Sequence, residues 1–129
     1  MRQGRSIIEE IVACSTEDWV FEDQIFGEIN EYYAIPDNET LFAMSIGVIV
    51  EILQAGLMYP VFVEDEPWEQ ERKVLDSWHG DTWAVMKRIE KQWRERVAEP
   101  GFSDVVWFGP TRKGYQRGTE VLHREGRRP

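Results

Sequence analysis

Residues 40–63 read TLFAMSIGVIVEILQAGLMYPVFV and carry a single charge, at Glu51. Apolar side chains fill residues 40–56 so densely that this part predicts a helix buried on most of its sides. Gly56 suits the C-terminal cap of that helix, because glycine readily adopts the left-handed backbone that ends many helices. Residues 57–63 then predict a β-strand. We therefore expect a buried helix that leads directly into a strand.

A membrane-spanning helix is the competing interpretation of the same residues. Against it stand Glu51, Gln54 and Gly56 within the stretch and the Tyr59–Pro60 step near its end. The flanks also lack the positive charge that usually anchors such a helix. The chain opens without a charged leader followed by an apolar run. We therefore expect a cytoplasmic protein that has no membrane partner.

Two amphipathic helices are predicted ahead of this stretch. A capping-box pattern at Ser6 and Glu9 predicts a helix that runs to about Cys14, and residues 19–21 predict a short extended segment. Aromatic and aliphatic residues then recur at spacings of three and four over residues 21–33, which predicts a second helix. Its expected outward-facing acidic side chains are Glu22, Asp23, Glu28 and Glu31.

The chain after the strand predicts an acidic turn, two further helices and a last strand. Residues 64–67 form the turn, and residues 68–78 follow with a helical pattern. Asp81 suits the N-cap of a stronger helix. The side chains expected on the inner face of that helix are Met86, Ile89, Trp93 and Val97, and Glu90 and Arg94 are expected to pair on its outer face.

The C-terminal part begins with a clear strand pattern. Residues 105–108 (Val-Val-Trp-Phe) predict a strand, and Gly109–Pro110 predicts a turn after it. Beyond Gly118 the chain is polar and basic, and we expect it to fray.

No motif in the sequence indicates a catalytic or metal-binding site. Cys14 is the sole cysteine of the 129 residues, which excludes an internal disulfide and a cysteine-based zinc site. Its position predicts a packed small side chain and not a nucleophile. His79 beside Asp81 is interpreted as a turn before a helix cap, because a metal site needs several converging ligands. Nucleophile elbows and phosphate-binding glycine loops are absent. We expect a protein that is not an enzyme and uses no cofactor.

Charge is distributed very unevenly along the chain, whose net charge is −9. Between Arg5 and Arg72 there are 16 acidic residues and no lysine or arginine. Residues 110–129, in contrast, carry six basic and two acidic side chains. A negative field of this kind repels nucleic acid and attracts cationic partners.

The order of predicted elements resembles a winged helix-turn-helix. Residues 55–58 (Ala-Gly-Leu-Met) resemble the link from the third helix into the wing. Residues 104–114 resemble the returning strand, which ends in a Thr-x-Lys-Gly turn at residues 111–114. The chain is also similar to small uncharacterised bacterial proteins that have Asp-Trp-Val near the start, here at residues 18–20. The resemblance covers about residues 6–115.

This resemblance implies an α+β, mostly helical fold with a winged-helix-like core and a small two- or three-stranded antiparallel sheet. We expect a single domain over residues 1–115, with a helical insertion at about residues 67–99. Residues 116–129 are expected to form a basic, flexible tail.

The resemblance also implies DNA binding, but the residues argue against it. Residues 37–56, the expected recognition helix, offer Asn38, Gln54 and three acidic residues without any positive charge. Base readout needs donors and acceptors at base edges and cations at the phosphates. The basic residues left for phosphate contacts are those of the wing and tail, namely Arg112, Lys113, Arg117 and Arg124.

The resulting hypothesis is a non-enzymatic acidic protein, monomer or homodimer, that binds a basic protein partner. Its most concrete form is an immunity protein or antitoxin that neutralises a basic bacterial toxin such as a nuclease. The alternatives are a winged-helix transcription regulator and an adaptor subunit whose apolar helix completes the core of another chain. The expected partner-binding residues, with Trp68 as an aromatic anchor, are Glu22, Asp23, Glu28, Glu31, Tyr32, Glu64, Asp65, Glu66 and Trp68.

Overall fold

Five helices and three strands make up the part of the chain that a computed structural model describes, residues 6–63, 75–97 and 105–124. The helices are α1 (Ile7–Ser15), α2 (Glu22–Tyr33), α3 (Asn38–Gln54), α4 (Thr82–Val97) and α5 (Arg112–Arg124). The strands are β1 (Val20–Phe21), β2 (Met58–Phe62) and β3 (Val106–Pro110). The expected α+β, mostly helical class is confirmed.

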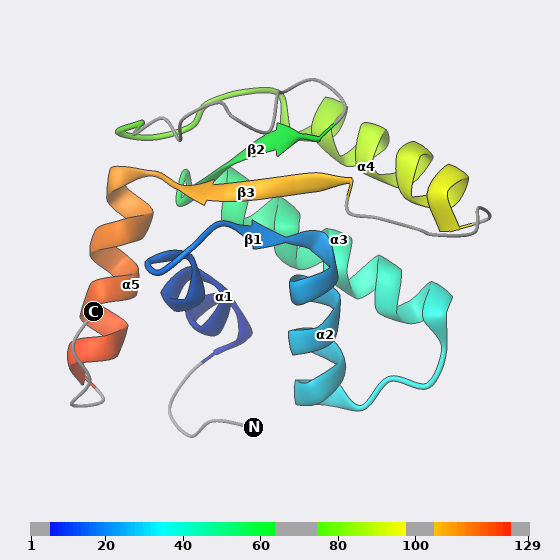
Figure 1. Cartoon of the computed structure of the whole chain (residues 1–129), viewed down its shortest axis with the longest axis horizontal. Helices are drawn as coiled ribbons and strands as arrows, with labels where there is room; N and C mark the ends of the chain where they lie inside the picture. Colours follow the sequence, from blue (N-terminus) through cyan, green and yellow to red (C-terminus); the bar gives the residue numbers. More distant parts are fainter. Residues whose placement is uncertain (1–5, 64–74, 98–104, 125–129) are drawn as a thin grey trace.

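The three strands form one antiparallel sheet with the order β1-β3-β2. Val20 of β1 pairs with Phe108 of β3, and Tyr59 of β2 pairs with Gly109 on the other side of β3. Figure 1 shows α1 and α2 beside β1, α4 beside β2, and α5 next to α1 at one end of the sheet. The central strand β3 therefore connects segments that lie far apart in the sequence.

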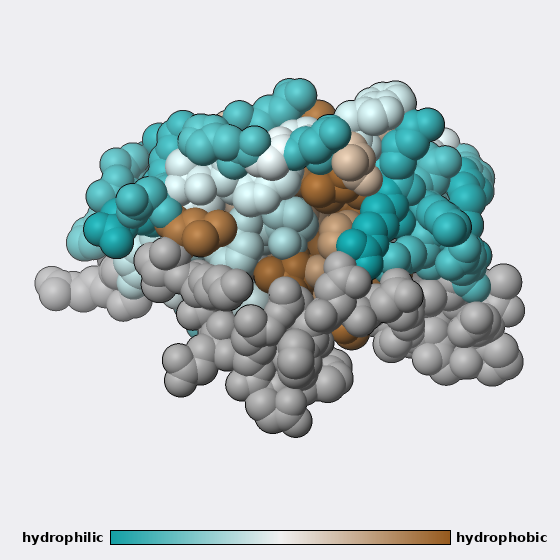
Figure 2. Space-filling view, turned by 90° about the horizontal axis from the view of Figure 1, so that it is seen from above, coloured by the Kyte–Doolittle hydropathy of each residue, from teal (hydrophilic) through white to brown (hydrophobic). Residues whose placement is uncertain are grey.

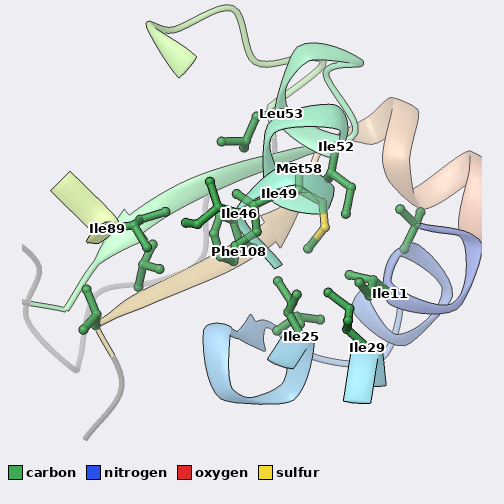
Figure 3. Close-up of a cluster of buried hydrophobic side chains, with 14 of the residues drawn as sticks. Ile11, Ile25, Ile29, Ile46, Ile49, Ile52, Leu53, Met58, Ile89 and Phe108 are labelled. Atoms are coloured by element: carbon green, nitrogen blue, oxygen red, sulfur yellow. The ribbon is translucent and has the colours of Figure 1, made fainter. Parts of the chain in front are cut away.

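The hydrophobic core forms where α3 packs against the sheet and the first two helices. Figure 3 shows the side chains of α3 converging with those of α1, α2 and the strands. The labelled core residues, all buried, are Ile11, Ile25, Ile29, Ile46, Ile49, Ile52, Leu53, Met58, Ile89 and Phe108. On the opposite face of α3, Ala43, Met44, Gly47 and Glu51 are exposed. The prediction of a helix at this place is confirmed, but burial on most of its sides is wrong.

The predicted cap at the end of α3 is confirmed. Gly56 has a φ of 72°, and its N–H donates to the carbonyl of Leu53 at 3.0 Å. The N–H of Leu57 donates to the carbonyl of Ile52 at 3.2 Å. This pair of hydrogen bonds is a Schellman motif, which satisfies two of the helix's terminal carbonyl groups and directs the chain into β2.

The caps predicted for α1 and α4 are also confirmed. The side chains of Ser6 and Glu9 accept each other's backbone N–H groups, as a capping box requires. Asp81 accepts the N–H of Ala84 at 3.1 Å. On α4, Ile89 is fully buried, Met86 and Trp93 are half-buried, and Arg94 lies 4.0 Å from Glu90. The side chain of Val97 is outside the described residues.

Two expectations about the C-terminal part are wrong. Gly109 and Pro110 do not form a turn but end β3 opposite Tyr59 and Met58. The chain beyond Gly118 does not fray before Arg124 but continues as α5, which packs along α1. The reason is close helix packing, because Gly118 lies against the backbone of α1 and Val121 and Leu122 are buried. Of the expected tail, residues 125–129 lie outside the described part.

The acidic turn at residues 64–67 and most of the helix expected at residues 68–78 also lie outside the described residues. Residues 75–78, the described end of that expected helix, are not helical.

The face of the molecule in Figure 2 is mainly hydrophilic, with hydrophobic side chains in a band near its middle. Across residues 6–63, 75–97 and 105–124, the large hydrophobic side chains that reach solvent most are Tyr33, Met44, Trp83 and Tyr115. None of the described helices combines the length and the apolar character that crossing a bilayer would require.

Candidate functional site

A groove with a volume of about 330 Å³ lies between α1 and α2. Its lining residues come from α1, β1 and α2 and are Ile11, Cys14, Val20, Gln24, Gly27, Glu28 and Glu31. The four residues from α2 follow spacings of three, one and three, so they form one stripe along that helix. We call this feature the α1–α2 groove. Its volume is at the small end of the range of roughly 300–1,000 Å³ for pockets that bind small molecules.

The walls of the groove are partly apolar. Ile11 and Val20 are buried, and Cys14 is half-buried. Gly27 lies in the middle of α2, and a Cβ added to it would meet no described atom within 4 Å. A glycine in a helix costs about 1 kcal/mol relative to alanine. Since close packing does not require glycine at this position, its effect is to leave the groove open.

Carboxylates and the thiol gather at one wall of the groove. One ligand atom each from Glu10, Cys14 and Glu28 lies within 4.8 Å of the others. The thiol of Cys14 donates to Glu10 at 3.8 Å, and Glu10 is only 1% exposed. Such oxygen and sulfur ligands are of the types that bind divalent metal ions.

Sequence reasoning missed this cluster. Glu10 and Cys14 are four residues apart on α1, a spacing that places both on one helix face. Glu28, in contrast, comes from α2, and its approach depends on how the two helices pack. The four-residue spacing was therefore the one local signal for this cluster.

Two of the acidic residues predicted on α2 lie where a partner can reach them. Asp23 and Glu31 are exposed, and Glu28 is half-buried in the groove. Tyr32 is half-buried and packs against the core, with its ring centroid 6.2 Å from that of Tyr33. Glu64, Asp65, Glu66 and Trp68 lie outside the described residues.

The prediction that Glu22 faces a partner is wrong. Its side chain is 0% exposed, and its two carboxylate oxygens accept the backbone N–H groups of Val105 and Val106, the latter at 3.1 Å. Glu22 follows β1 directly, and the pairing of β1 with β3 brings the start of β3 to this carboxylate. Glu22 therefore joins α2 to the central strand.

The basic side chains of α5 are held by the fold itself. Arg124 and Arg117 lie 2.9 Å and 3.2 Å from the carboxylate of Glu9 on α1. The hydrogen bond from Arg124, the Ser6 backbone and the charges of both arginines lower the pKa of Glu9 to about 2. Figure 1 places α5 and α2 on opposite sides of α1, so this positive charge lies away from the groove.

The two basic residues at the start of α5 are engaged as well. Lys113 donates to the carbonyl of Ala55 at 2.8 Å, beyond the last turn of α3. Arg112 forms an exposed ion pair with Asp76 at 3.0 Å. The four basic residues considered for phosphate contacts therefore all have partners within the protein.

The first 58 described residues, 6–63, contain 11 acidic side chains and no lysine or arginine. Several of these acids have structural partners, whereas Glu17, Asp23 and Glu31 are exposed near α1 and along α2. Both helices that form the α1–α2 groove thus carry negative charge and no basic residue. Comparisons of the chain with protein-family models, with curated proteins and with solved structures find no match.

Proposed function

We propose that this chain is a non-enzymatic protein whose acidic α1–α2 face binds a basic protein partner. In its most concrete form it is an immunity protein or antitoxin that covers a cationic bacterial toxin such as a nuclease. The observation that carries the proposal is the separation of charge, with exposed carboxylates along α2 and the basic residues of α5 paired on the far side of α1.

Electrostatics explains why such a face suits a basic protein. Charges of one sign on one side of a protein raise the rate at which an oppositely charged partner arrives, and they disfavour partners of the same charge. Asp23 and Glu31 supply exposed charge on α2, and Glu28 adds charge inside the groove. Nucleic acid is repelled by the same residues.

A winged-helix-like core is part of this proposal. It is supported by the order α1-β1-α2-α3-β2-α4-β3, in which α4 lies within the expected insertion between the two wing strands, and by the sheet order β1-β3-β2. In such a core α3 would be the recognition helix, yet its exposed positions include Ala43, Met44, Gly47 and Glu51, and it has no lysine or arginine. These residues offer no cation to a phosphate, which favours a protein partner over DNA.

The test is capture of partners from the native lysate at low salt, with the intact protein as bait and with nuclease treatment as a control. A bait with Asp23→Lys and Glu31→Lys is compared with a Glu51→Lys bait, which changes charge on the outer face of α3 instead. We expect the intact and Glu51→Lys baits to retain one basic protein after nuclease treatment, and the α2 variant to lose it.

A DNA-binding function predicts the opposite pattern. In that case the captured material disappears on nuclease treatment, and the protein binds duplex DNA at low salt through residues 110–129. Equal capture by the α2 variant and by the intact protein would also contradict the proposal, because the acidic face would then be irrelevant.

A further inference from the structure

We infer that the α1–α2 groove accepts an arginine side chain from the basic partner. The inference rests on the proposed function, because that function is what identifies the partner as a protein. The chemistry of the groove, however, can be tested without that partner. Three features of the groove carry it: apolar walls, carboxylates at one side, and an open stretch at Gly27.

The apolar part of the groove fits the aliphatic portion of a long cationic side chain. Ile11 and Val20 provide buried hydrocarbon surface, and Gly27 leaves the adjoining helix face uncovered. Arginine and lysine commonly bury their methylene groups along such surface while the charged end contacts polar groups. A purely apolar ligand would use only half of this lining, and an anionic ligand would be repelled by its carboxylates.

The carboxylates of the groove favour a ligand side chain that ends in a positive charge. Glu28 and Glu31 line the groove about one turn apart on α2, and the carboxylate of Glu10 lies 3.8 Å from the sulfur of Cys14. A guanidinium group can donate in parallel to carboxylate oxygens, and it loses its hydration more easily than an ammonium group. Arginine is therefore favoured over lysine, and buried arginine side chains are frequent anchors of protein interfaces.

A second copy of this chain is a poorer occupant of the groove. The arginines of α5 are paired with Glu9 and Asp76, and Arg94 of α4 is held by Glu39 at 3.1 Å. Arg88 lies 4.1 Å from the ring of Phe62. These contacts concern only the described arginines, but the net charge of −9 also makes two copies of the chain repel each other, so charge complementarity points to a different, basic protein.

Binding in the groove can be measured through Cys14, because it is the sole cysteine of the chain and lines the groove. The rate at which iodoacetamide alkylates it is followed by mass spectrometry on the full chain. N-acetyl-arginine amide is the probe, and N-acetyl-citrulline amide, its uncharged analogue, is the control. A single side chain binds weakly, so at about 10–50 mM probe we expect alkylation to slow by about twofold or more. Citrulline amide should leave the rate unchanged.

Two matched glycine variants locate the effect. Gly27→Leu places a side chain in the groove, and Gly47→Leu places the same side chain on the outer face of α3, where a Cβ also meets no described atom. We expect the effect of arginine amide to vanish in the first variant and to persist in the second. Glu31→Gln serves as a second, isosteric variant that adds no bulk to the fold, and in it the effect of arginine amide should weaken.

The inference is overturned if arginine amide does not slow alkylation of the intact chain, or if citrulline amide slows it equally. It is also overturned if arginine amide still slows alkylation in the Gly27→Leu variant. Failure of the proposed function looks different. In that case arginine amide protects Cys14, but no basic protein is captured. If a basic protein is captured and leaves Cys14 as reactive as before, the proposed function stands and the arginine inference fails.

Discussion

Replacing Glu22 with glutamine tests the role of this buried carboxylate most severely. The carboxylate accepts two backbone N–H groups, from Val105 and Val106, at the start of the central strand. Glutamine can accept one of these hydrogen bonds, but it turns its own NH₂ group toward the second donor. A hydrogen bond to a charged group contributes about 1.5–3 kcal/mol, and an unsatisfied buried donor costs about 1–3 kcal/mol. We expect the free energy of unfolding to fall by about 2–3 kcal/mol.

The assay is urea unfolding followed by tryptophan fluorescence, with the slope compared as well as the midpoint. Glu17→Gln is the control, because Glu17 is exposed and a surface change of this kind stays within about 0.5 kcal/mol. A loss of less than about 1 kcal/mol for Glu22→Gln, at an unchanged slope, would refute the reasoning. It would mean that the contact between α2 and β3 is dispensable.

Three further predictions concern the docking of α5 and the open helix faces. The lowered pKa of Glu9 stabilises the fold above about pH 4.5, and this contribution is lost as the pH falls toward 2. Glu9→Gln should therefore lower the free energy of unfolding by up to about 3 kcal/mol at pH 7 and by almost nothing near pH 2. Urea unfolding at both pH values measures the difference. Gly114→Ala should destabilise the fold by more than about 2 kcal/mol, because its Cβ would overlap the carbonyl of Leu57. Gly47→Ala should stabilise the fold by up to about 1 kcal/mol, because a Cβ there meets no described atom. Equal thermal midpoints for the two variants would contradict both expectations. Thr111→Val should lower the free energy of unfolding by about 2–3 kcal/mol. The Thr111 hydroxyl donates to the carbonyl of Gly56 at 2.7 Å and accepts the N–H of Gly114 at 3.0 Å, and valine can do neither. An unchanged urea midpoint would contradict this role of Thr111.

Local signals in the sequence predicted those elements whose ends are defined by their own residues. The capping box at Ser6 and Glu9 marks the start of α1, and Gly56 marks the end of α3. Both signals act over four or five residues, so they can be recognised without knowledge of the tertiary structure.

Features that depend on packing between distant segments were missed. The helix α5 contains two glycines, which locally oppose a helix, yet the same glycines allow its backbone to approach Leu57 and α1. The burial of Glu22 likewise depends on the pairing of β1 with β3. A helical periodicity alone placed its side chain on the wrong face.

The candidate site was predicted in part. The exposed charges of Asp23 and Glu31 follow from the periodicity of α2, and the structure places both on its surface. The groove itself needs α1, which carries Cys14, to pack beside α2, which carries Gly27, and no local sequence pattern encodes how these two helices pack.

The association rate of the captured basic protein with this chain, measured by stopped-flow fluorescence at low and high ionic strength, tests the central claim most directly. We expect fast association that slows steeply as salt is added, since screening weakens charge steering. Asp23→Lys with Glu31→Lys should slow association at low salt and flatten its salt dependence, while Glu51→Lys should leave both nearly unchanged. Equal association rates for the intact protein and the α2 variant at low salt would contradict the account.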